Sequence, residues 1–229
     1  MSEIIDIYFY DLFALFWILF MWFGYNIFAD YKSLRSKNNI YQIMHQYRIN
    51  WMNDCIKRED KVMDINAIAC FVRTGAFFAS TSIIIIAFLL PLFTMAEEAI
   101  SIFSNIPFTD ITNHFWEVKT SLLLVIFIYA FFKYTWSIRQ YNYAIAILLS
   151  TPIAAKNNTK ANKSAIERNA KILSNAARHF SMGIRAYYLG LVSLSWFINP
   201  CIFIVLTTAV ILIIYRREFR SRALSIMKP

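Results

Sequence analysis

Four basic residues stand inside or beside strongly apolar stretches, where an isolated charge is costly. With three polar or aromatic neighbours they form one candidate set: Arg73, Lys133, Arg139, Gln140, Arg185, Tyr187 and Tyr188. Charges within membrane segments usually face a cavity or a partner and mark binding sites or pathways. We expect these residues to lie at a similar depth, as a basic ring that attracts a lipid headgroup, a phosphate or a permeating anion.

A second interpretation of the same charges stays open. Long basic side chains can reach from the end of a helix to the lipid headgroups, and Lys133 would lie only about 9 Å short of the inner membrane edge. The tyrosines and the tryptophan around it would then form an interfacial aromatic belt. Snorkelling explains arginine less well, because the planar guanidinium usually has a definite partner.

Signals for catalysis are weak. The histidines, His45, His114 and His179, lie in separate segments, and the three cysteines have no spacing that predicts a disulfide or a zinc site. With four glycines in the chain no Gly-rich phosphate loop can form, which excludes a nucleotide-driven pump. We expect no cofactor, no metal and no catalytic residues.

The composition predicts the class of protein. The chain has 229 residues, of which 59% are hydrophobic and 16% charged, whereas soluble domains have about 25% charged residues. Four hydrophobic blocks approach the ~20 residues that a membrane crossing requires; they are residues 8–28, 67–95, 120–138 (continuing as a helix to about 150) and 184–215. We predict a single-domain, all-α integral membrane protein built as a bundle of these blocks.

Basic residues predict the orientation. They concentrate between the first and second blocks and between the third and fourth, while the connection between the second and third is acidic, with Lys119 as its basic residue. Because Lys and Arg collect on the cytoplasmic side, the N-terminus should lie outside. The protein should be a multi-pass protein of the plasma (bacterial inner) membrane.

The fourth block is too long for one crossing and has a basic end. Four single crossings would leave that end outside, against the charge rule. Asn199-Pro200 is a strong turn signal, so we favour a helical hairpin there that returns the C-terminus to the cytoplasm. One long, proline-kinked helix is the alternative.

Two amphipathic helices are expected in the cytoplasm, at about 40–62 and 160–180, with a polar mobile loop before the second. The first should bury an apolar stripe, either at the membrane surface or under the bundle. The stripe consists of Ile40, Met44, Tyr47, Trp51 and Cys55. The acidic residues near its end should form helix ion pairs, such as Asp54 with Arg58.

Several segments together resemble a known family. They are MHQYRINWM, REDKVMD, FASTSIIII, YAFFKYTWSIRQYNY, RHFSMGIRAYY and YRREFRSRAL. This combination is similar to the membrane-protein family catalogued as domain of unknown function 599, found in bacteria and plants, from about Asp11 to Leu224. The resemblance implies an integral membrane protein and brings no established activity or site residues.

Three functions compete. A homo-oligomeric channel or transporter comes first, because the basic ring and the small-residue faces around Gly75 and Gly190 suit an assembled pathway. A protein that binds anionic lipid headgroups, or a scaffold, comes second, and a membrane enzyme third. The net charge of +9 is explained by cytoplasmic loops and anionic lipid, so no nucleic-acid partner is expected.

Overall fold

The computed structural model describes residues 2–35, 39–94, 98, 113–153 and 159–227, and every regular element in these residues is a helix. This confirms the all-α class. The long helices are α1 (Ser2–Arg35), α2 (Ile40–Cys55), α3 (Val62–Leu89), α6 (Asn113–Ser150), α7 (Thr159–Ser193) and α8 (Pro200–Phe219). The short ones are α4 (Pro91–Thr94), the 3₁₀ helix η1 (Leu194–Phe197) and α9 (Arg222–Met227).

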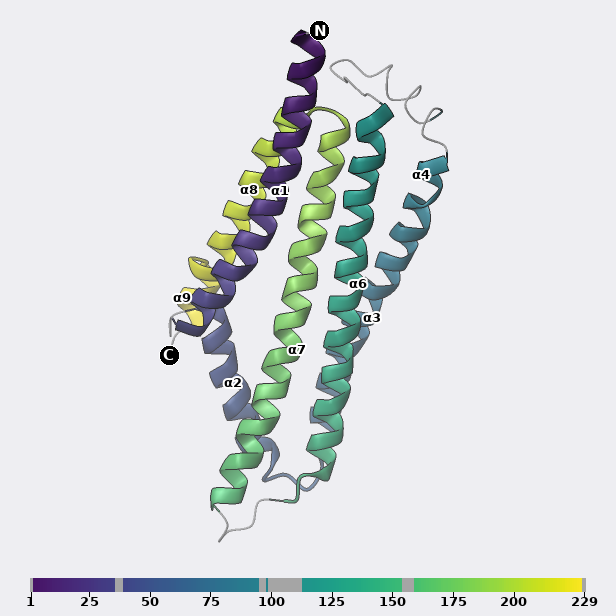
Figure 1. Cartoon of the computed structure of the whole chain (residues 1–229). Coiled ribbons are helices and arrows are strands. Elements are labelled where there is room, and N and C mark those ends of the chain that lie inside the picture. The colour runs from purple at the N-terminus through teal and green to yellow at the C-terminus, as the bar shows by residue number, and fades with distance from the viewer. Residues whose placement is uncertain (1, 36–38, 95–97, 99–112, 154–158, 228–229) are drawn as a thin grey trace.

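The helices form one elongated bundle with two levels (Figure 1). In the upper level, α1, α3, α6, α7 and α8 run side by side, with the N-terminus at the top. In the lower level, α2 joins the extended ends of α3, α6 and α7, beyond the ends of α1 and α8. The long α6 and α7 pass through both levels and connect them.

Four helical segments are long and apolar enough to cross a membrane, namely Phe9–Lys32, Val62–Phe93, Phe115–Ser150 and Pro200–Met227. Large apolar side chains point outward from them, for example Phe16, Phe77 and Val205. An apolar exterior is what lipid requires of a membrane bundle. These findings confirm a multi-pass membrane protein.

Each level has its own apolar core. The upper core gathers side chains from α1, α3, α6, α7 and α8, including Ile18, Ile126 and Leu189. The lower core joins α2 to α3, α6 and α7 through Met52, Ile68, Leu148 and Leu173. The lower level is therefore a packed helical unit with its own apolar core.

The predicted hairpin is present at Asn199-Pro200. The side-chain oxygen of Asn199 accepts hydrogen bonds from the backbone N–H of Cys201 (2.8 Å) and Ile202 (3.4 Å), and Pro200 opens α8. This is the usual N-cap arrangement, in which proline's missing N–H does no harm. The rings of Trp196 and Phe203 stack across the turn with centroids 5.2 Å apart. As a result α7 and α8 run antiparallel (Figure 1).

Two expectations about the lower level were wrong. The first amphipathic helix ends at Cys55 instead of continuing to residue 62, and its buried residues are Ile43, Met52 and Cys55. Tyr47, assigned to the buried stripe, is exposed. The apolar side chains of this helix meet α7 on one side and α3 and α6 on the other, so the buried face is rotated from the one that spacing alone suggests.

Helix α7 begins at Thr159, close to the expected start near residue 160, and continues without a break into the fourth hydrophobic block. The loop expected before it falls largely on residues 154–158, which lie outside the described residues. At the C-terminal end of α6, the Lys61 ammonium donates to the carbonyls of Leu148 (3.1 Å) and Thr151 (2.6 Å). A cation there satisfies carbonyls that the end of α6 leaves open.

Helix α7 comes very close to α6 at its glycines. A Cβ atom on Gly183 would stand 2.7 Å from the ring of Tyr134, and one on Gly190 2.9 Å from the ring of Phe127. Small residues therefore serve packing within the chain at these positions, where a side chain would collide with an aromatic ring.

Candidate functional site

Arg185 is the most firmly held member of the predicted basic ring. It is buried, and its Nε and Nη2 donate to the two carboxylate oxygens of Glu218, each at 2.8 Å. Its Nη1 donates to Asn26 at 3.1 Å, and its guanidinium lies 5.3 Å from the ring of Tyr25. The Tyr25 hydroxyl donates to the same carboxylate at 2.8 Å. Arg185 thus ties α7 to both α1 and α8.

The other basic members of the set do not join it in one ring. Arg139 is exposed, and its Nε donates to Tyr143 on the same helix at 2.5 Å. Arg73 is also exposed, on α3. Lys133 is half-buried with its ammonium 5.1 Å from the ring of Tyr129.

The three polar members have different surroundings. Gln140 is buried, and its side-chain oxygen has no hydrogen-bond partner within the described part of the chain. The Tyr187 hydroxyl donates to the carbonyl of Phe78 on α3 at 2.9 Å, and the Tyr188 hydroxyl accepts from Arg217 on α8 at 3.3 Å.

A groove along α7 brings some of these residues together with others that the sequence did not single out. Three cavities, of about 210, 50 and 380 Å3, follow one another along the helix. Adjacent cavities share lining residues: Tyr41 between the first two, and Ser181 and Arg185 between the last two. We call this feature the α7 groove.

The lower end of the α7 groove is polar and basic, with Lys171 and Arg178 from α7 facing Tyr41 and His45 from α2. Arg178 forms an ion pair with Asp30 of α1, in which Nη2 lies 2.5 Å from Oδ2 and Nε donates to Oδ1 at 3.2 Å. This pair fixes the guanidinium between the two levels of the bundle.

Ser174 on α7 connects this helix to α2 at the lower end of the α7 groove. Its hydroxyl lies 2.8 Å from His45 Nδ1 and accepts from Arg48 at 3.3 Å. Burial, with the nearby charges of Arg48 and Lys171, lowers the pKa of His45, so the imidazole is neutral near pH 7. Burial also raises the pKa of the Tyr41 hydroxyl, although Arg185, Arg178 and Arg48 pull it down, so Tyr41 keeps its proton and can donate.

The upper end of the α7 groove combines charge with apolar surface. Arg185, Arg217 and Tyr188 lie beside Ile184 and Ile214. Since Glu218 neutralises Arg185, Arg217 supplies the net positive charge here.

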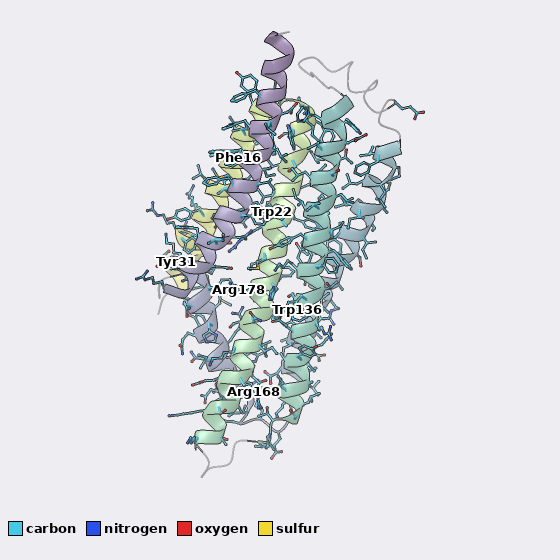
Figure 2. The ribbon with its side chains drawn as sticks, viewed as in Figure 1. Phe16, Trp22, Tyr31, Trp136, Arg168 and Arg178 are labelled. Carbon is cyan, nitrogen blue, oxygen red and sulfur yellow. The ribbon has the colours of Figure 1, made fainter. Side chains whose placement is uncertain are left out.

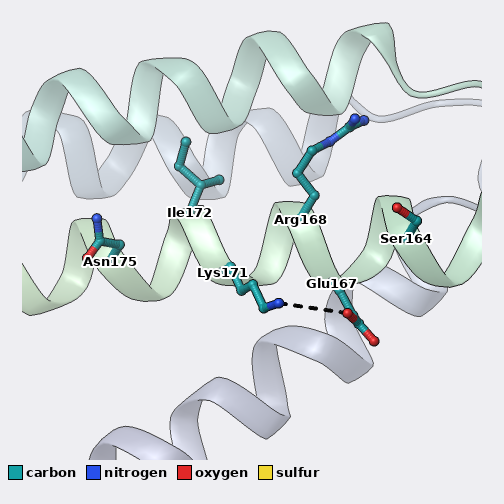
Figure 3. A pocket seen from close by; sticks show the side chains of 6 residues that line it. All are labelled: Ser164, Glu167, Arg168, Lys171, Ile172 and Asn175. Carbon is teal, nitrogen blue, oxygen red and sulfur yellow. Dashed lines mark ion pairs between the residues drawn. The ribbon is translucent and has the colours of Figure 1, made fainter. Parts of the chain in front are cut away.

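Below the α7 groove, a shallower hollow of about 630 Å3 continues along the same helix (Figure 3). Its lining residues are Ser164, Glu167, Arg168, Lys171, Ile172 and Asn175. Lys171 belongs to both features and lies 3.8 Å from Glu167. Both side chains of this pair are well exposed, so the contact contributes little and leaves the ammonium accessible.

A second buried charge pair lies near the top of the bundle. The ammonium of Lys119 on α6 lies 3.2 Å from Oδ1 of Asp11 on α1, and both side chains are almost fully buried. The indole N–H of Trp196, at the hairpin, donates to the same oxygen at 2.7 Å. The sequence placed Lys119 at an outer membrane entry; its side chain instead points into the protein because Asp11 is there to receive it.

Two further expectations about ionisable residues are changed by the structure. Asp54 pairs with Lys57 (3.2 Å), not with Arg58, which instead contacts the buried Asp64 at 2.9 Å. Residue 114, expected in a connecting loop, lies in the first turn of α6. Among the described residues no three His, Cys, Asp or Glu side chains are placed to hold a metal ion.

One sequence signal could have revealed the α7 groove. Lys171, Arg178 and Arg185 follow at intervals of seven residues, and Ser174, Ser181 and Tyr188 repeat the interval beside them. Such spacing places each trio on one face of a helix. The signal was divided, because the sequence assigned the first two basic residues to a cytoplasmic helix and the third to a membrane block.

Three comparisons with known proteins give one match. No curated protein and no solved structure matches the chain. The family described as "Protein of unknown function, DUF599" matches residues 13–223, which is most of the sequence. The chain therefore belongs to this family.

Proposed function

We propose that this protein binds anionic lipid headgroups in the α7 groove, at the cytoplasmic surface of the membrane. The observation that carries the proposal is the basic lining of the α7 groove at the junction of the two levels. In this arrangement the N-terminus lies outside, five helices pass through the upper level, and the lower level stands in the cytoplasm. This function was the second hypothesis from the sequence.

The position of aromatic side chains supports this depth. Tyr31, Arg178 and Trp136 lie in one band across the middle of the bundle, between Trp22 above and Arg168 below (Figure 2). Tyr and Trp are enriched where membrane meets water. For a lipid whose headgroup lies at this band, the upper end of the α7 groove would be next to the acyl chains. The lower end of the α7 groove would face the cytoplasm.

The charge of the lining favours an anion. Of the acids near it, Asp30 and Glu218 are each engaged by an arginine, and Glu167 pairs loosely with Lys171, whose side chain stays well exposed. Arg217 is exposed as well. A basic residue near an anionic membrane contributes about 1 kcal/mol to binding. Basic pockets between helices on this side of a membrane are typical headgroup sites.

The channel or transporter hypothesis has less support from the geometry. Its main basis was a ring of arginines, but Arg185 is closed against Glu218, and Arg139 lies on the outer surface. Between α3, α6 and α7, the rings of Phe78, Tyr134 and Tyr187 pack within 5.6 Å of one another, centroid to centroid. A pathway and a homo-oligomer stay predictions, for which ion flux in vesicles is the direct measurement.

The proposal can be tested on the purified protein in neutral detergent. Phosphatidylglycerol should raise the thermal unfolding midpoint more than phosphatidylcholine, and salt should weaken this effect. Arg217→Gln, at the upper end of the α7 groove, should reduce the phosphatidylglycerol effect. The matched changes Arg73→Gln and Lys160→Gln, at exposed residues outside the α7 groove, should retain it.

Two results would count against the proposal. If the groove variant and the control variants lose the phosphatidylglycerol effect to the same extent, diffuse surface charge binds the lipid. An anion flux that depends on Lys171 and Arg217, without any lipid effect, would favour the channel.

A further inference from the structure

The α7 groove has two basic stations at different depths. The lower station contains Lys171, Arg178 and His45, and the upper contains Arg217 and Tyr188 beside Arg185. Arg178 and Arg185 are seven residues apart on one helix, which is about 10 Å along its axis. Since α7 runs along the bundle, the two stations are separated along the bundle axis. In the proposed arrangement they lie at different depths and not next to each other at one depth.

The walls change in polarity between the stations. Phe180, Ile184 and Ile214 line the upper cavity, whereas Gln42, His45 and Asn175 line the lower one. An amphiphile would place its acyl end at the upper station and extend its headgroup toward the lower. The narrow middle cavity, lined by Tyr41 and Ser181, connects the two.

The accessible positive charge also differs between the two stations. At the upper station Arg185 uses Nε, Nη1 and Nη2 on Glu218 and Asn26, which leaves Arg217 as the accessible cation. At the lower station Asp30 occupies Nε and Nη2 of Arg178, and within the described residues no hydrogen bond or ion pair uses Nη1. Lys171 lies 3.8 Å from Glu167, but its side chain stays exposed. Arg48 donates to the hydroxyl of Ser174, which lines this station, at 3.3 Å.

We infer that the ligand is a lipid with two phosphates at different depths: a diester at the membrane surface and a phosphomonoester on the distal part of its headgroup. The inference rests on the proposed function and names its ligand class. A diester carries one negative charge, which suits Arg217. A phosphomonoester carries close to two at pH 7, which suits Lys171, Arg178 and Arg48. A lipid with both phosphates at one depth would engage the upper station alone.

The test compares lipids at equal total negative charge in vesicles that contain the reconstituted protein. Phosphatidylinositol 4-phosphate has the distal monoester, phosphatidylglycerol lacks it, and cardiolipin has two diesters at one depth. Phosphatidylinositol 4-phosphate should bind about tenfold more tightly than the other two. Soluble inositol 1,4-bisphosphate, which lacks the acyl chains, should compete only weakly.

Variants separate the two stations. Lys171→Gln should remove the preference for phosphatidylinositol 4-phosphate while binding of phosphatidylglycerol persists, whereas Arg217→Gln should weaken both lipids alike. Arg73→Gln is the matched control, and the unfolding midpoint of each variant checks its fold.

The failures are distinguishable. Equal binding of all three lipids, or unchanged preference in Lys171→Gln, overturns the two-station ligand and leaves headgroup binding intact. Competition by the soluble bisphosphate at the affinity of the lipid overturns a lipid ligand in favour of a soluble phosphate. If none of these ligands binds, the proposed function fails as well.

Discussion

Replacing Asp11 with Asn should destabilise the protein strongly, because it leaves the buried ammonium of Lys119 without a counter-charge. At 3.2 Å the pair attracts with about 5 kcal/mol at an effective dielectric constant near 20. Removing one partner of a buried pair typically costs about 3–5 kcal/mol. For a chain of this size, that corresponds to a fall of roughly 6–20 °C in the unfolding midpoint.

An exposed pair of the same length provides the control. Asp54 and Lys57 also lie 3.2 Å apart, but with 61% and 58% of their side chains exposed, against 2% and 3% for Asp11 and Lys119. Asp54→Asn should therefore cost less than about 1 kcal/mol. Thermal unfolding in detergent, followed by tryptophan fluorescence, measures both variants.

A double variant completes the test. Adding Lys119→Met to Asp11→Asn removes the unpaired charge and keeps an amide oxygen for the Trp196 N–H, so it should restore much of the lost stability. Two results would contradict this description of a buried pair. One is an unfolding midpoint of Asp11→Asn no lower than that of Asp54→Asn, and the other is a double variant with a lower midpoint than Asp11→Asn alone.

Three further outcomes are expected. Gly183→Ala should lower stability by about 1–3 kcal/mol, because its methyl group meets the ring of Tyr134 at 2.7 Å; Gly24→Ala, with open space around it, should be neutral or slightly stabilising, and unfolding midpoints compare the two. Because the pKa of His45 is lowered below 6.5, its contribution to stability should be complete above that pH and be lost as the pH falls through the lower value. His45→Gln should flatten the pH profile in this range, and an unchanged profile would exclude His45 as its source. In a cysteine-free background, Ile198→Cys at the hairpin should react with an impermeant thiol reagent on intact cells, whereas Lys160→Cys should react only after permeabilisation; the reverse pattern would invert the topology.

The sequence was sufficient for the helical class, the membrane segments and the hairpin, because each depends on local features. Apolar length predicts a crossing, and Asn199-Pro200 both ends one helix and caps the next. The face of α2 could not be predicted in this way. Its neighbours α3, α6 and α7 lie elsewhere in the chain, and their positions determine whether Tyr47 or Met52 is buried.

The site could be predicted only in part, because its contacts also join segments that are distant in the sequence. The sequence identified Arg185 as a charge that needs a partner, but Glu218 stood in an arginine-rich tail that read as a solvated cytoplasmic end. Asp11 and Lys119 were both expected on the outer side, in separate segments and without a contact between them. Partners from distant segments are visible only after α1, α6 and α8 are brought together.

The contacts between α1 and α8 also constrain the order in which the protein assembles. Tyr25 donates to Glu218 and Trp17 donates to Thr208 across more than 190 residues of sequence. Helix α1 therefore leaves the ribosome long before α8 supplies these two partners. During synthesis Trp17 and Tyr25 must find other hydrogen-bond acceptors in water, at lipid headgroups or in the insertion machinery. Truncation before α8 would leave both donors without these acceptors and give quality-control proteases a chain they can distinguish from the finished one.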